Sequence, residues 1–501
     1  MSDSAPSPRS RAERRTPGSF DELWGAGGEA VRREFEAVCA WLDETPISEL
    51  ARRQSAAEAA FRSLGITFKV YGDEQDGERI IPFDIIPRVF SCAEWERLSN
   101  GLEQRVRAIN LFIADVYGPR HILNDKVVPS DIVLANPQFC IPVAGARPPH
   151  DVYAHICGID IVRTGADDFF VLEDNARTPS GVSYMLENRE AMLRLCPELF
   201  ARVEVQPIDT YPDLLRSTLL SVAPRGAHDP VCVLLTPGQY NSAFYEHSFL
   251  ADSMGIELVE GRDLEVVDDL VWMRTIEGLV RVDVIYRRID DAFLDPLVFN
   301  PESNLGVPGL IAAYRAGNVT IVNAPGTGIA DDKAIYSFMP EIVRYYMGEE
   351  AKLPNVETWR CREPEALAFV LENLAKVVVK VVDGSGGYGM LIGPTASKAE
   401  IEKFRAALVA EPHRYIAQPT LALSTVPTLT DAGIAPRHVD FRPFVLSGAD
   451  GVTIVPGGLT RVALDAGSLV VNSSQGGGTK DSLIIAAPRE EEEQHALPYG
   501  R

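Results

Sequence analysis

The stretch Lys380-Val-Val-Asp-Gly-Ser-Gly-Gly-Tyr-Gly389 places a lysine at the end of an apolar segment, with four glycines after it. Glycines 384, 386 and 389 have the G-x-G-x-x-G spacing of dinucleotide-binding loops, but that fingerprint requires a helix after the loop. Residues 390–392 are apolar and predict a second strand instead, which disfavours a Rossmann dehydrogenase. A glycine loop between two strands can cover phosphates with its N–H groups, and a lysine adds positive charge. The predicted phosphate-binding set is Lys380, Gly384, Ser385, Gly386, Gly387 and Gly389, with a flexible surface hairpin as the alternative.

A second motif, rich in oxygen ligands, lies earlier in the chain. Asp160 and Glu173 flank a turn at residues 165–168, which predicts that they lie on neighbouring antiparallel strands. Glu173 and Asn175 are two residues apart and share a strand face, whereas Asp174 points away. Asp160, Glu173 and Asn175 therefore predict a magnesium site that nucleotide phosphates complete. The alternative is a solvated turn between ordinary polar strands.

Five further residues are weak signals when taken one by one. Lys333 begins a predicted helix, and Gln418 ends a strand that could present an adenine-reading edge. Arg442, Arg461 and Lys480 lie in strand–turn contexts that can meet phosphate.

The pattern around these motifs predicts a mixed α/β (α+β) fold. Between residues 231 and 323, strand and helix patterns alternate, which predicts a parallel sheet. Residues 93–124 and 331–346 have helical spacing, and residues 438–456 predict a β-hairpin.

Composition excludes several classes of protein. The chain has 501 residues and a formal net charge of −23, so a nucleic-acid coating role is disfavoured. There is no signal-peptide pattern at the N-terminus and no apolar run long enough to span a membrane. The seven cysteines are widely spaced and include no C-x-x-C pair. We therefore expect a cytoplasmic protein with reduced thiols and without membrane or nucleic-acid partners.

Taken together, the motifs resemble the ATP-grasp superfamily. Glu173-x-Asn175 with Pro179 and Gly181, preceded by Asp160, resembles the metal-binding segment of D-alanine–D-alanine ligases. In those enzymes the metal segment follows the nucleotide lysines, whereas here it precedes them. The order is cyclically consistent and resembles the circularly permuted ATP-grasp family of bacterial proteins, akin to glutathionylspermidine synthases. The resemblance covers about residues 66–485.

The resemblance implies roles for the weaker motifs. Lys333 and Lys380 resemble the two nucleotide lysines of the fold, and Gln418 lies where the adenine hinge is expected. Arg442 and Arg461 resemble arginines that meet the triphosphate, and we group them with Lys480 as catalytic candidates.

The sequence pattern and the resemblance together predict a division of the chain. The expected parts are a disordered arm (1–17), a helical segment (18–65), a permuted part of the core carrying the metal strands (66–225), an α/β substrate subdomain (226–330), a nucleotide-binding subdomain (331–435), the remainder of the core (436–487) and an acidic tail (488–501).

The implied activity is that of an ATP-dependent carboxylate–amine ligase acting through an acyl phosphate. Its cofactors would be ATP and Mg²⁺, and its partners a small-molecule or peptide carboxylate and an amine. Arg461 would stabilise the acyl phosphate or the tetrahedral intermediate. The candidates for substrate binding are Arg163, Ser180, Gly181, Arg287 and Arg288. The alternatives are a phosphotransferase of the same fold and an inactive nucleotide-binding scaffold.

Overall fold

The computed structural model describes residues 16, 18–25, 28, 30–68, 79–384, 389–471 and 476–486. The predicted acidic tail and, apart from Thr16, the predicted disordered arm lie outside these residues. The loop residues Ser385, Gly386 and Gly387 lie outside them as well. Within the described part of the chain, no helix combines the length and apolar character needed to cross a membrane.

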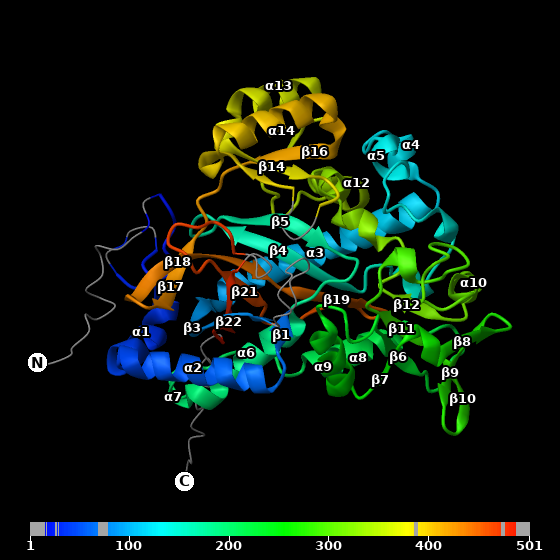
Figure 1. The fold of residues 1–501 in the computed structure, drawn as a ribbon, viewed down its shortest axis with the longest axis horizontal. Helices are drawn as coiled ribbons and strands as arrows, with labels where there is room; N and C mark the ends of the chain where they lie inside the picture. Colours follow the sequence, from blue (N-terminus) through cyan, green and yellow to red (C-terminus); the bar gives the residue numbers. More distant parts are fainter. Residues whose placement is uncertain are drawn as a thin grey trace, which may run out of the picture.

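The largest sheet has nine strands in the order β20-β19-β4-β18-β21-β22-β3, with β17 beside β18 and β5 beside β4 (Figure 1). Its strands are β3 (Phe83–Phe90), β4 (Ile156–Arg163), β5 (Phe169–Asn175), β17 (Thr425–Thr430), β18 (Gly433–Arg442), β19 (Phe444–Gly448), β20 (Gly451–Ile454), β21 (Leu459–Val462) and β22 (Gly478–Ile484). Strands from the two ends of the chain alternate, since β4 lies between β19 and β18 and β22 pairs with β3. One core is therefore built from segments that are far apart in the sequence.

Helices cover both faces of this sheet. Along β19, Val445 packs in the core with α3 (Cys92–Tyr117), whereas Phe444 and Leu446 pack in the core with α2 (Ile47–Ser63) and α6 (Val182–Leu195). Because successive side chains point to opposite faces, α3 lies across the sheet from α2 and α6. A capping box between Ser91 and Glu94 begins α3 by satisfying otherwise unpaired backbone donors.

A second sheet has the order β12-β11-β6-β7, and all its pairs are parallel. Its elements are β6 (Cys232–Leu235), α9 (Phe244–Met254), β7 (Glu257–Val259), β11 (Val284–Arg287), α10 (Leu310–Arg315) and β12 (Thr320–Val322). The prediction of a parallel α/β region is thereby confirmed. Residues 264–282 add an antiparallel sheet that the alternation did not predict, made of β8 (Leu264–Val267), β9 (Leu270–Thr275) and β10 (Gly278–Val282).

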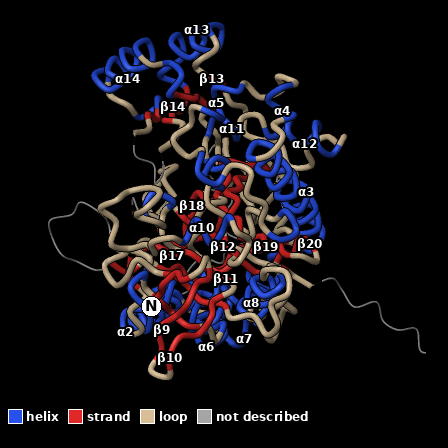
Figure 2. Tube along the Cα trace, turned by 90° about the vertical axis from the view of Figure 1, so that its right-hand side faces the viewer, coloured by secondary structure: helices blue, strands red, loops and turns tan. Residues whose placement is uncertain are grey.

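A third sheet, of order β13-β16-β14-β15, carries the glycine loop. Its elements are β13 (Trp359–Arg360), α13 (Pro364–Asn373), β14 (Val377–Val381), β15 (Leu391–Ile392), α14 (Lys398–Ala410) and β16 (Tyr415–Pro419). The antiparallel pairing of β14 with β15 confirms that the loop connects two strands. α13 and α14 lie at one end of the molecule, with β9 and β10 at the other (Figure 2).

Shorter segments complete the fold. The helical N-terminal segment begins later than predicted, with α1 (Glu36–Glu44), and continues into α2. Strand β17 belongs to the large sheet, not to the predicted nucleotide-binding subdomain, because it pairs with β18 along its full length. The remaining strands and α-helices are β1 (Thr67–Phe68), β2 (Arg79–Ile80), α4 (His121–Asn124), α5 (Ser130–Leu134), α7 (Pro197–Phe200), α8 (Tyr211–Ser221), α11 (Lys333–Tyr336) and α12 (Met339–Met347). Short 3₁₀ helices, among them η7 (Thr327–Asp331), lie in the connections.

Candidate functional site

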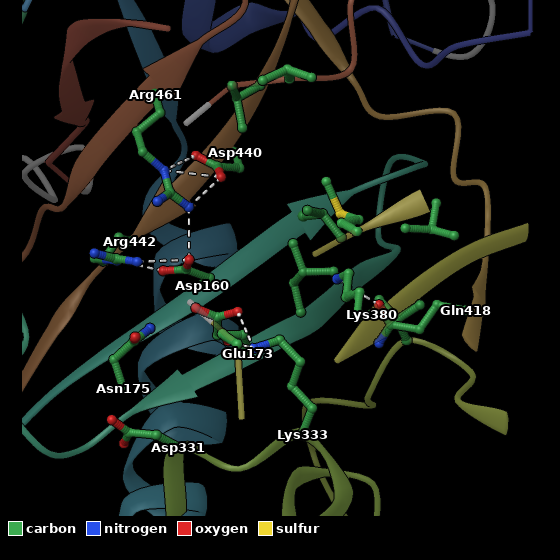
Figure 3. Close-up of a pocket in the computed structure, with 18 of the residues that line it drawn as sticks. Asp160, Glu173, Asn175, Asp331, Lys333, Lys380, Gln418, Asp440, Arg442 and Arg461 are labelled. Atoms are coloured by element: carbon green, nitrogen blue, oxygen red, sulfur yellow. Dashed lines mark hydrogen bonds and ion pairs between the residues drawn. The ribbon is translucent and has the colours of Figure 1, made fainter. Parts of the chain in front are cut away.

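A cavity of about 530 Å³ lies between the large sheet and the sheet that carries the glycine loop. The large sheet contributes Asp160, Glu173, Asn175, Asp440, Arg442 and Arg461 to its lining (Figure 3). The opposite wall contributes Lys333, Lys380, Gly384 and Gln418. Most of the residues singled out in the sequence therefore converge on one place.

Lys380 lies on β14 beside Gln418 on the neighbouring strand β16. Its Nζ donates a hydrogen bond of 2.8 Å to the Gln418 Oε1, and the Gln418 Nε2 donates to the Thr358 Oγ1 at 3.0 Å. The Gln418 amide therefore orients Lys380. Both ends of the amide are engaged, so adenine reading by Gln418 stays a prediction.

The charge of Lys380 is sensitive to its surroundings. Burial and the neighbouring Lys333 lower the pKa of Lys380 to about 8, although Glu173 acts in the opposite direction. A lysine in water ordinarily keeps its proton well above that pH. Lys380 is thus a cation whose charge a bound polyanion would stabilise.

Lys333 begins α11, as the sequence predicts. The preceding Asp332 caps this helix, because its Oδ1 accepts from the N–H groups of Ala334 and Ile335. The Lys333 Nζ donates to the carbonyl oxygen of Gly384 and lies 3.5 Å from the Glu173 Oε2. Lys333 therefore connects the first residue of the glycine loop to the acidic strand β5.

The oxygen-rich motif has the predicted strand geometry. Asp160 on β4 is paired directly with Glu173 on β5, and Glu173 and Asn175 both face the cavity. Asp174 faces away from it and receives two hydrogen bonds of 2.6 Å from the Arg105 guanidinium. The alternation along β5 thus separates an acid held by the fold from residues that are open to a ligand.

Asp160 already has two positively charged partners. Arg442 donates to its two carboxylate oxygens at 2.5 and 2.8 Å, and Arg461 donates to Oδ2 at 2.7 Å. Arg461 is held in turn by Asp440, its cross-strand neighbour, at 2.9 and 3.0 Å. Burial disfavours the charged form of Asp160, but the two arginines outweigh it and hold the pKa well below its usual range.

The residues fit a magnesium ion through Glu173 and Asn175. Among the described residues, the buried Asn175 Nδ2 has no hydrogen-bond partner, and the carboxamide oxygen is the atom that could ligate the ion. Over the ranges that the structure describes, no group of three or more His, Cys, Asp or Glu side chains could hold a metal by itself. An ion here would need the amide and phosphate oxygens in addition, which is the usual arrangement for Mg²⁺ with a nucleotide.

Asp331 is a cavity residue that the sequence reasoning missed. Its Oδ1 accepts a hydrogen bond of 2.6 Å from the Ala176 N–H, and its Oδ2 lies 3.8 Å from the Arg177 Nε. Burial raises the pKa of this carboxyl to about 7. The available signal was its place two residues before Lys333, at the end of a glycine-containing turn.

The predicted substrate residues divide into two groups. Ser180 and Gly181 line the cavity, but the three arginines are not among its described lining residues. Arg288 donates to Glu246 at 2.9 Å and to the Pro179 carbonyl at 2.6 Å, so it supports the loop that carries Ser180.

The other two arginines hold the fold together. Arg287 is fully buried, donates to the carbonyls of Asn323 and Ile289, and forms an ion pair with Asp291. Arg163 is buried against Glu22 and Glu94, and its guanidinium lies over the Phe20 and Phe169 rings. These contacts leave neither guanidinium directed at a substrate in the cavity, which corrects the expectation.

Lys480 also lies outside the described lining of the cavity. Its fully buried ammonium bonds to Asp84 and donates to the carbonyls of Ile86 and Pro427 at 2.8 and 2.9 Å. The reason is register: Arg461 is paired with Thr479, so Lys480 projects from the opposite face of the sheet. The expectation that Lys480 acts with Arg461 is therefore corrected.

Relatives of similar length have no assigned function in their names. An uncharacterised protein of Synechocystis sp. is 52% identical over 470 residues, which cover 94% of this chain and 98% of that protein. An uncharacterised protein of Mycobacterium tuberculosis is 48% identical over 468 residues, which cover 93% of this chain and 84% of the relative.

Two other similarities carry informative names. A putative glutamate–cysteine ligase of Frankia alni is 42% identical over 477 residues, and this chain spans only 54% of its length. The structure of a glutathione synthetase-like effector from Globodera pallida in its apo form matches with a TM-score of 0.56 at 12% identity, covering 88% of this chain and 98% of that one. The second match is a similarity of fold.

The family model described as circularly permuted ATP-grasp type 2 matches residues 87–463. Its span includes Lys333 and Lys380, the oxygen-rich strands, and Arg442 and Arg461. The chain belongs to the circularly permuted ATP-grasp type 2 family.

Proposed function

We propose that this protein is an ATP-dependent carboxylate–amine ligase that acts through an acyl phosphate. The observation that carries the proposal is the convergence of Lys333 and Lys380 with Glu173, opposite the Asp160–Arg442–Arg461 cluster, in one cavity. The family assignment and the names of a ligase-like relative and a synthetase-like structural neighbour support an ATP-dependent ligase.

The nucleotide would bind along the wall that carries the two lysines. Lys380 would contact phosphate oxygens, and Lys333 would hold the glycine loop through Gly384 while it faces the same anion. Gly389 has a φ of +69°, a conformation that favours glycine at the end of the loop. Apolar side chains that include Val378 and Ile392 line the same wall and suit a planar base.

The proposed reaction has two steps. A carboxylate oxygen of the first substrate bonds to the γ-phosphorus of ATP, and the bond from that phosphorus to the ADP oxygen breaks. The amine nitrogen then bonds to the acyl carbon, the carbon–oxygen bond to phosphate breaks, and the protons lost by the amine pass to phosphate and solvent. Mg²⁺ bound through Glu173, Asn175 and phosphate oxygens would neutralise charge on the transferred group.

Arg442 and Arg461 would provide fixed positive charge for the phosphoryl group and the developing oxyanion. Asp440 holds Arg461 from behind, and Asp160 holds both guanidinium groups, so little reorganisation is needed when charge develops. Asp160 makes these contacts with both oxygens, and its role as a third metal ligand stays a prediction.

The test is isotope transfer from the carboxylate. The protein is supplied with ATP, Mg²⁺, candidate amines and carboxylic acids labelled with ¹⁸O, and products are analysed by mass spectrometry. An acyl phosphate predicts one ¹⁸O atom in the released phosphate for each amide formed. A stable phosphorylated product without amide would identify a phosphotransferase, and an absence of ADP release with every pair would favour a nucleotide-binding scaffold.

A further inference from the structure

Arg177 and Asp331 form a pair of opposite charges in the cavity that the proposed reaction does not use. Both residues line the cavity, and the Arg177 Nε lies 3.8 Å from the Asp331 Oδ2. At this distance the two groups form an ion pair, but they are too far apart for a hydrogen bond. Asp331 lies beside Asn175 and on the far side of Glu173 from Lys380 (Figure 3).

The guanidinium of Arg177 is positioned but not fully bonded. Its Nη1 donates to the Asp290 Oδ2 at 2.9 Å and to the Gln138 Oε1 at 3.4 Å. Its Nε is buried and has no hydrogen-bond partner among the described residues. A buried donor of this kind is costly unless a ligand or water accepts from it, so its position inside a cavity indicates a missing acceptor.

The carboxylate of Asp331 is also only partly engaged. Its Oδ1 is held by the Ala176 N–H, which sets the orientation of the group, while Oδ2 has the long contact with Arg177. A side chain held at one oxygen can offer the other to a cationic donor.

Gly328 fixes the place of the pair. A Cβ at this position would come within 3.1 Å of the Arg177 Cδ and 2.8 Å of the Gln138 Oε1. A side chain here would therefore press on the flexible ends of Gln138 and Arg177, and Arg177 would have to shift by a few tenths of an ångström. The close packing holds Arg177 beside Asp331 without changing either charge.

We infer that Arg177 and Asp331 bind the carboxylate and the ammonium group of one zwitterion, so that the amine substrate is an α-amino acid. An α-amino acid carries both charges on a single carbon, which matches two protein charges separated by one ion-pair distance. Asp331 would place the nitrogen beside Asn175, near the region where the acyl phosphate is expected to form. The inference rests on the proposed function for the role of that nitrogen, but the binding of the head group can be tested without turnover.

The experiment compares ligands that differ by one charge. The full-length protein, at pH 8 with Mg²⁺ and a non-hydrolysable ATP analogue, is titrated calorimetrically with the twenty amino acids, their α-amides and their N-acetyl derivatives. At least one free amino acid should bind about tenfold or more tightly than both of its derivatives, because each derivative loses a charge-assisted contact.

The variants assign each charge to its residue. Arg177→Gln should remove the preference for the free acid over the amide, and Asp331→Asn should remove the preference over the N-acetyl derivative. Gly328→Ala should weaken both preferences although it keeps both charges. Arg194→Gln and Asp167→Asn, on exposed ion pairs away from the cavity, should change neither preference.

The inference is overturned if no free amino acid binds, or if amides and N-acetyl derivatives bind as well as the free acids. It is also overturned if the preferences survive in Arg177→Gln and Asp331→Asn. The proposed function fails separately: amino acids would then bind with these preferences, but no ¹⁸O would pass from any carboxylate to phosphate.

Discussion

The two walls of the cavity hold their positive charges in different ways. On the lysine wall, Lys380 is bonded to a neutral amide and Lys333 to a backbone carbonyl, with Glu173 at 3.5 Å. On the arginine wall, Arg442 and Arg461 are bonded to two buried carboxylates. The lysine wall therefore carries positive charge that is available to an incoming polyanion. The guanidinium groups of the arginine wall are already held in place by carboxylates before any ligand arrives.

The largest expected effect concerns the two proposed magnesium ligands, Glu173 and Asn175. Glu173→Gln combined with Asn175→Ala should lower magnesium-dependent turnover by about a thousandfold, because metal-assisted charge neutralisation is lost. ADP release measured across a magnesium titration provides the test. Asp174→Asn is the matched control on the same strand: it should lower stability through Arg105 but leave the magnesium dependence unchanged. Magnesium-dependent turnover that survives the double substitution would move the metal site elsewhere.

Removal of the positive charge of Lys380 should mainly weaken ATP binding. Lys380→Ala is expected to reduce ATP affinity by about a hundredfold, since a buried charge contact to phosphate is lost. Equilibrium binding of a fluorescent ATP analogue measures the change, with exposed Lys398→Ala as control. Equal affinity in Lys380→Ala and the native chain would contradict the assignment of this wall to nucleotide.

On the arginine wall, the expected effect is on folding. Asp440→Ala should reduce the free energy of unfolding by about 3 kcal/mol, because Arg461 loses one of its buried partners. Chemical denaturation monitored by fluorescence measures this loss. Glu190→Ala breaks an exposed pair with Arg194 and should change stability by less than about 1 kcal/mol. Similar losses in the two variants would show that the buried cluster is not a rigid support.

The smallest expected effect is a pH dependence that only the lysine wall should produce. The lowered pKa of Lys380, about 8, means that the side chain is charged below this pH and loses its proton as the pH rises through it. ATP affinity should therefore fall severalfold between pH 7 and pH 9, measured at constant ionic strength. Lys380→Arg should flatten this dependence, because an arginine stays charged throughout the range. If the ATP affinity of the native protein does not change between pH 7 and pH 9, the charge of Lys380 does not contribute to ATP binding.

Strand parity explains which sequence predictions hold. Within one strand, alternation decides relative faces, so Glu173 and Asn175 could be separated from Asp174 by counting residues. Apolar segments on both sides of the glycines predicted the loop between β14 and β15, and alternating strand and helix patterns predicted the parallel α/β region. These features depend on local pattern and need no knowledge of neighbouring strands.

The wrong predictions concern side chains whose position depends on contacts between different strands and segments, which residue counting within one strand cannot give. Arg461 is paired with Thr479 on the neighbouring strand. Lys480 is the next residue along that strand, so its side chain lies on the opposite side of the sheet. Arg163 and Arg287 have the same chemistry as Arg461 but lie in buried contacts elsewhere. Arg163 meets Glu94, which is distant in sequence, whereas Arg287 is held by the carbonyl of Asn323 and by Asp291, four residues along the chain.

The sequence by itself therefore determined the motifs, their cyclic order and the parity of each strand, because these are properties of adjacent residues. Only the tertiary structure decided which charges meet. Asp160 contacts Arg442 and Arg461, which are 282 and 301 residues away along the chain. The strands that carry these three residues are interleaved in one sheet. Asp331, at the end of η7, meets Arg177, just after β5, across about half that separation. Opposite charges come together through strand pairing and burial. Neither strand pairing nor burial can be read from the spacing of residues along the chain.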